Sequence, residues 1–171
     1  LHTNMKILKR YVRDIFYGAN DGVITTFAVV TGAAGASLGD NIVLILGFAN
    51  LIADGFSMAA SNYLGNRSDH ETNNGGEDID HGRLYKHATV TFFSFVIAGS
   101  LPLFPYALNM GGFVVACVAT AVTLFVIGAS LGRIVIKKSW AACGLRMLTV
   151  GGTAAVIAFI IGRLIGQFLG A

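Results

Sequence analysis

Five long segments of mainly apolar residues, separated by short polar stretches, dominate the sequence. They run over residues 15–38, 41–65, 88–108, 112–136 and 143–169. A helix of about 20 residues is long enough to cross the hydrocarbon core of a bilayer. Backbone groups must find their partners within the segment in lipid, which favours helices. The pattern therefore predicts an all-α integral membrane protein, with residues 1–171 forming a single five-helix membrane domain.

The composition agrees with this pattern. Hydrophobic residues make up 54% of the chain and charged residues 12%, with a mean hydropathy of +0.68. Residues 88–132 contain no Asp, Glu, Lys or Arg at all. A soluble domain of this size could not bury such a run, and about a quarter of its residues would normally be charged. Nucleic-acid binding, a secreted disulfide scaffold and intrinsic disorder are therefore excluded as primary interpretations.

Two polar regions flank the apolar segments. Residues 4–14 place apolar side chains on one helical face and four cations on the others, which predicts a short interfacial helix on an anionic leaflet. Residues 65–87 are rich in charge and predict a polar cytosolic loop between the second and third spans.

The distribution of Lys and Arg predicts the orientation of the chain. With a cytosolic N-terminus, the cytosolic side holds all but one of the 12 basic residues, and the exception is Arg163. The cytosolic set comprises Lys6, Lys9, Arg10, Arg13, Arg67, Arg83, Lys86, Arg133, Lys137, Lys138 and Arg146. Five spans then place the C-terminus on the far side. The sequence fits a bacterial plasma membrane and a vacuolar membrane equally, because both put the cytosol on the basic side.

Small residues recur at the spacing that lets helices approach closely. The glycines concerned are Gly18 and Gly22, Gly128 and Gly132, and Gly162, Gly166 and Gly170. Packing within one chain and a seam between two copies are both open. The two prolines, Pro102 and Pro105, predict a broken last turn at the far end of the third span.

Two acidic residues, Asp21 and Asp54, lie well inside predicted spans, where a charge is costly and usually functional. Asn50, Asp54 and Met58 are four residues apart and share one helical face. Asp21 and Thr25 share a face of the first span in the same way. The helical rise places Asp21 and Met58 at similar depths, so the two faces are expected to meet.

These side chains form a candidate site for a divalent cation. Carboxylate and amide oxygens suit Mg, Ca or Mn, and a thioether moves the preference toward softer metals such as Fe(II). A buried carboxylate also tends to take up a proton when no cation neutralises it. The predicted metal ligands are thus Asp21, Met58, Asp54, Asn50 and Thr25. Packing for Met58 and a helix-to-helix hydrogen bond for Asn50 remain alternatives.

The polar loop offers a second, weaker candidate. Its carboxylates and imidazoles could gather metal at the cytosolic mouth, or could simply be a solvated connector. The residues are Asp69, His70, Glu71, Glu77, Asp78, Asp80 and His81. No nucleophile–base pair or phosphate-binding loop occurs in the sequence, so we expect neither an enzyme nor a resident cofactor.

Four stretches resemble the vacuolar iron transporter family, which includes the yeast-type vacuolar iron/manganese carriers. Residues 17–22 (YGANDG) with 25–27 resemble its first-span signature, and residues 53–64 (ADGFSMAASNYL) its second. Residues 92–106, with the two prolines, resemble the third span, and residues 144–152 the start of the fifth. The short region between the second and third spans is similar to the nodulin-like and bacterial branch.

This resemblance implies a homodimer whose translocation path is lined by the first two helices of each copy. It implies Fe(II) export from the cytosol, with Mn(II) in some members, in exchange for protons. The transport ligands of the family fall on Asp21 and Met58. Two departures stand out. Asn50 occupies a position where many members have a glutamate, and the long glutamate-rich insertion of plant and parasite members is absent.

The sequence therefore predicts a proton-coupled Fe(II) or Mn(II) exporter. Its partners are the metal ion, protons, membrane lipid and a second copy of the chain, and nucleic acid is not expected. A non-transporting membrane protein that binds a cation, and a passive cation channel, are the alternatives.

Overall fold

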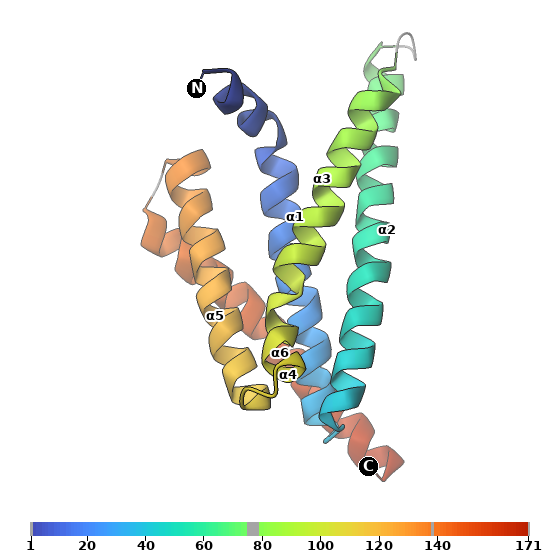
Figure 1. The fold of residues 1–171 in the computed structure, drawn as a ribbon, viewed down its shortest axis with the longest axis vertical. Coiled ribbons are helices and arrows are strands. Elements are labelled where there is room, and N and C mark those ends of the chain that lie inside the picture. The colour runs from blue at the N-terminus through green and yellow to red at the C-terminus, as the bar shows by residue number, and fades with distance from the viewer. Residues whose placement is uncertain (1, 75–78, 138, 171) are drawn as a thin grey trace.

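The computed structural model describes residues 2–74, 79–137 and 139–170, and within these ranges it contains helices and turns but no strand (Figure 1). The all-α prediction is confirmed. The long helices are α1 (His2–Gly35), α2 (Asp40–Asn74), α3 (His81–Gly99), α5 (Gly112–Leu131) and α6 (Trp140–Leu169). Shorter elements are the 3₁₀ turn η1 (Leu101–Leu103), the one-turn helix α4 (Phe104–Ala107) and the π-helical turn η2 (Gly132–Ile136).

Helix α1 is the central element of the bundle. It packs against α2, α3, α5 and α6, and Figure 1 shows α2 and α3 on one side of it and α5 on the other. Val23, Thr26 and Val30 are completely buried along it. The helix that carries the first candidate aspartate is therefore enclosed by its neighbours.

In the described part of the chain, four helical segments are long and apolar enough to cross a membrane. They are Asp40–Thr72, His81–Ala107, Gly112–Val135 and Trp140–Leu169. These correspond to the second, third, fourth and fifth predicted spans. Helix α1 does not reach the same apolar content because its central turns contain Asn20, Asp21 and several threonines and glycines. Since neighbouring helices enclose it, α1 needs fewer apolar side chains than a helix that faces lipid.

Two predicted boundaries were wrong. The region expected as a loop over residues 65–87 is helical up to Asn74 and again from His81. An ion pair between Arg67 and Glu71, four residues apart, supports the extra turns of α2. The Asp80 side chain accepts a hydrogen bond from the backbone N–H of Arg83 and caps α3. The interfacial helix predicted over residues 4–14 is not a separate element, because α1 continues through it without interruption.

The two prolines end α3 as predicted. Neither proline can donate a backbone hydrogen bond, so regular α-helix stops at Gly99 and gives way to η1 and α4. The turn from α4 into α5 then uses Gly111, whose φ of +88° is readily accessible only to glycine.

Of the glycines predicted to pack helices, all but Gly170 make close contacts within the chain. A Cβ on Gly22 would collide with the backbone carbonyl of Phe95 in α3, and one on Gly162 with the carbonyl of Gly32 in α1. A Cβ on Gly128 would lie 2.7 Å from the carbonyl oxygen of Cys143 in α6. The bundle therefore depends on these bare backbone surfaces for its close helix contacts.

Candidate functional site

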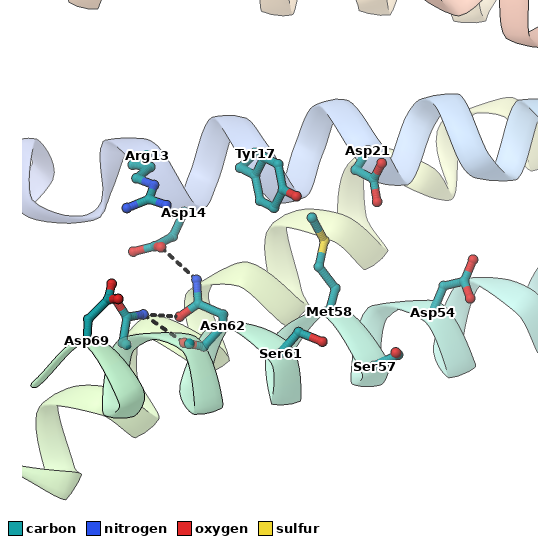
Figure 2. A pocket seen from close by; sticks show the side chains of 12 residues that line it. Arg13, Asp14, Tyr17, Asp21, Asp54, Ser57, Met58, Ser61, Asn62 and Asp69 are labelled. Atoms are coloured by element: carbon teal, nitrogen blue, oxygen red, sulfur yellow. Dashed lines mark hydrogen bonds between the residues drawn. The ribbon is translucent and has the colours of Figure 1, made fainter. Parts of the chain in front are cut away.

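A polar cavity of about 560 Å³ lies between α1 and α2. Its lining comes only from these two helices (Figure 2). The lining residues are Arg13, Asp14, Tyr17 and Asp21 of α1, and Asp54, Ser57, Met58, Ser61, Asn62, Gly65, Asn66 and Asp69 of α2. One face of each helix thus supplies carboxylates, amides, hydroxyls and a thioether to a shared space.

Three of the five predicted ligands lie together in this cavity. Asp21 projects from α1, and Asp54 and Met58 project from α2 on the same side (Figure 2). The Met58 side chain extends across the space toward α1, near the level of Asp21. The depth argument from helical rise therefore gave the right neighbours.

The other two predicted ligands do not line the cavity. Asn50 donates a hydrogen bond from Nδ2 to Oδ2 of Asp54 over 2.9 Å, so it acts on the cavity through that carboxylate. The Thr25 hydroxyl donates to the backbone carbonyl of Asp21 over 2.9 Å. Both contacts follow the i, i+4 spacing that the sequence analysis used.

The half of the cavity nearer the N-terminus of α1 contains a network that the sequence analysis did not find. Asp14 is only 5% exposed. Its Oδ1 accepts from Asn62 Nδ2 over 2.9 Å, and its Oδ2 pairs with His87 Nδ1 over 2.5 Å. Asn62 also donates to the hydroxyl of Thr91 over 3.1 Å. Residues of α1, α2 and α3 are thereby joined through one buried carboxylate.

Helical spacing alone could have revealed part of this network. Asn62 and Asn66 extend the row of Asn50, Asp54 and Met58 by further steps of four residues. Asp14 lies two turns before Asp21 on α1. His87 carried no such signal, because its contact with Asp14 spans 73 positions of sequence.

The acidic and histidine residues of the predicted loop are dispersed. Asp69 lines the cavity, Glu71 pairs with Arg67, and Asp80 caps α3. His81 Nδ1 lies 2.9 Å from the hydroxyl of Tyr63. Glu77, Asp78 and, elsewhere, Lys138 lie outside the described residues. Within the described ranges, no three His, Cys, Asp or Glu side chains form a group that could hold a metal ion.

Long apolar helices around a carboxylate-lined cavity define a multi-pass integral membrane protein. The sequence pattern of the VIT family matches residues 12–79 and 74–163, which is most of the chain. The chain belongs to the VIT family.

Individual relatives are similar along nearly the whole chain. A protein of Toxoplasma gondii named vacuolar iron transporter is 26% identical, with 99% of this chain and 78% of the relative covered. A Plasmodium berghei protein of the same name is 24% identical, with 92% and 83% covered. Vacuolar iron transporter homolog 3 of Arabidopsis thaliana is 27% identical, with 92% and 84% covered.

The alignments differ in length in an informative way. The Toxoplasma gondii alignment extends over 240 positions, although this chain has 171 residues, so that relative carries a long segment without a counterpart here. The alignment with the Arabidopsis thaliana homolog needs only 174 positions. The two family matches meet at residues 74–79, between α2 and α3.

Proposed function

We propose that this chain is a metal-ion transporter that moves Fe(II), with Mn(II) as a second cargo, out of the cytosol in exchange for protons. The observation that carries the proposal is the cavity that brings Asp21, Asp54 and Met58 together between α1 and α2. We propose iron as the cargo because the relatives are named vacuolar iron transporter.

The chemistry of the cavity fits this cargo. Asp21 and Asp54 offer hard carboxylate oxygens, and Met58 offers a soft sulfur, a combination that suits Fe(II) better than Mg or Ca. A carboxylate removed from water binds a proton when the metal leaves, since desolvation disfavours its charged form. The same groups can therefore carry the metal in one direction and protons in the other.

The proposal includes five spans and a dimer. Helix α1 has 34 residues and lies among the other four long helices, so we place it across the membrane with its N-terminus in the cytosol. The proposed ligands of one chain, Asp21, Asp54 and Met58, are few for a metal ion. A two-fold partner would supply each of these ligands a second time.

The test is Fe(II) uptake into proteoliposomes with and without a pH gradient, for the wild type, Asp21→Asn and Asp40→Asn. Asp40 is the matched control, because it is exposed at the start of α2 and does not line the cavity. We expect gradient-dependent uptake in the wild type, at least a tenfold loss in Asp21→Asn, and little change in Asp40→Asn.

Other outcomes would favour the other classes of protein. Uptake that does not depend on the pH gradient and moves no protons would indicate a passive channel. Saturable Fe(II) binding without any transmembrane movement would make it a membrane cation-binding protein. Full uptake by Asp21→Asn would remove the proposed site from the transport path.

A further inference from the structure

Asp14 and His87 form a buried ion pair at the cytosolic end of the cavity. Their side chains are 7% and 15% exposed, and Nδ1 of His87 lies 2.5 Å from Oδ2 of Asp14. The second carboxylate oxygen is held by the neutral amide of Asn62. On α3, the Thr91 hydroxyl donates to the His87 backbone carbonyl over 3.0 Å.

The surroundings of the pair contain few other titratable groups. The Tyr11 ring of α1 packs against the imidazole with centroids 4.7 Å apart. Arg13 of α1 and Asp69 of α2 line the same cavity as Asp14. The groups of α2 and α3 in hydrogen-bond contact with the pair, Asn62 and Thr91, are neutral. Neither Asn62 nor Thr91 therefore adds a charge beside the pair.

We propose that the Asp14–His87 pair is a proton-binding site coupled to the metal ion in the cavity, and that it releases its proton when the ion enters. This inference rests on the proposed function, because it names the residues that bind one of the exchanged protons. The step needs no reactant other than water. The pair gives up one proton to water, His87 becomes neutral, and Asp14 keeps its negative charge.

Electrostatics gives the direction of the coupling. Asp14 lines the cavity and lies two helical turns, roughly 10 Å, from Asp21 along α1. With a proton on the pair, the two charges cancel and the pair contributes little to the attraction of a cation. Once the proton has left, Asp14 adds a negative charge to the cavity. Charges at this separation interact appreciably where little water screens them.

The coupling must be reciprocal, so two measurements describe it. A metal ion in the cavity disfavours the proton on the pair, and a proton on the pair weakens metal binding. For one fully linked proton, the metal affinity rises up to about tenfold per pH unit in the range where the pair titrates.

The experiment measures Fe(II) binding to the purified full chain under anaerobic conditions, together with the protons released into weak buffer. Wild type and His87→Gln are compared from pH 5.5 to 8.5. Glutamine keeps an N–H that can reach the Asp14 carboxylate but does not titrate. Asp14→Asn is the second variant, which keeps the shape of the carboxylate and removes its charge.

We expect His87→Gln to release up to one proton fewer per Fe(II) near pH 6.5 and to show a flatter dependence of affinity on pH. Near pH 8.5 the two proteins should release equal numbers, which serves as an internal control. Asp14→Asn should lose the same pH-dependent component and bind Fe(II) more weakly at pH 8.5.

Equal proton release by the wild type and His87→Gln at pH 6.5 would overturn this inference and leave the proposed function intact. A wild type that binds no Fe(II) would overturn the proposed function, and this inference with it. If His87→Gln does not fold, the same comparison with Asp14→Asn decides the question.

Discussion

Three of the four carboxylates that line the cavity, Asp14, Asp21 and Asp54, differ in what they contact. Both oxygens of Asp14 have partners, and one oxygen of Asp54 accepts from Asn50. In the part of the chain that the structure describes, the Asp21 carboxylate has no side-chain hydrogen-bond partner, although its own helix and α2 enclose it. A carboxylate in such a position gains most from a cation, because nothing else replaces its lost hydration. At the scale of single residues, Asp21 is thus the best candidate for the principal ligand.

Met58 determines the metal preference if it is a ligand. Met58→Leu keeps the volume of the side chain but removes the sulfur, so Fe(II) transport should fall by roughly tenfold and Mn(II) transport much less. The measurement is uptake of each ion into proteoliposomes under the same gradient. Met110→Leu is the control, because Met110 is exposed outside the cavity. Equal losses for both ions would show that Met58 acts through packing.

At the scale of helices, close backbone contacts hold α1 in the centre. Gly18 and Gly22 face the backbone of α3, and Gly35 faces that of α6. These contacts matter to the site because α1 carries Asp14 and Asp21, and its distance from α2 sets the width of the cavity. The alignment of the two polar faces therefore depends on glycines that have no chemistry of their own.

Gly22→Ala tests this dependence. Its Cβ would collide with the Phe95 carbonyl, a backbone atom that cannot move aside cheaply, so we expect a loss of about 1–3 kcal/mol in stability. The measurement is thermal unfolding in detergent, where the melting temperature should fall by several degrees.

Gly152→Ala is the matched control for this substitution. Gly152 also lies in a long helix, but nothing lies within 4 Å of the added carbon. Alanine should leave its stability unchanged or raise it slightly, since alanine is the better helix former. Equal destabilisation by the two variants would contradict the packing role of Gly22.

At the scale of the whole molecule, the basic residues predict the orientation in the membrane. Lys138 lies outside the described residues, and of the other 11 Lys and Arg residues all but Arg163 lie toward the helix ends on the side of the α1 N-terminus. In the tight connection between α1 and α2, by contrast, the charged residue is Asp40, the first residue of α2. The asymmetry predicts that the mouth of the cavity near Asp69 opens to the cytosol.

Thiol labelling in sealed vesicles tests this orientation. In a background with Cys117 and Cys143 replaced by alanine, Ser68→Cys should react with an impermeant maleimide only when the cytosolic face is accessible. Ser37→Cys should react only from the other face. Both positions are exposed; Ser37 lies in the turn before α2, and Ser68 lies near the other end of that helix. Labelling of both from one side would refute the predicted topology.

The sequence by itself determined the class of protein, because lipid forces long apolar segments into helices and spacing along a helix is fixed by its 3.6-residue period. This period brought Asn50, Asp54 and Met58 onto one face, and the helical rise matched Asp21 to Met58. It also marked the break at Pro102 and Pro105. At residues 65–87, polar composition was taken for the absence of helix. At residues 4–14 the predicted helix is present, and the error was to separate it from the first span.

Only the tertiary structure decided which polar residues act together across helices. The contact between Asp14 and His87 joins α1 to α3 through the interior, and no local pattern encodes a pairing over 73 positions. The tertiary structure likewise showed that Thr25 does not line the cavity, because its hydroxyl donates to a backbone carbonyl of its own helix. Periodicity determines the face of a helix, whereas the packing of glycine against backbone determines what that face meets.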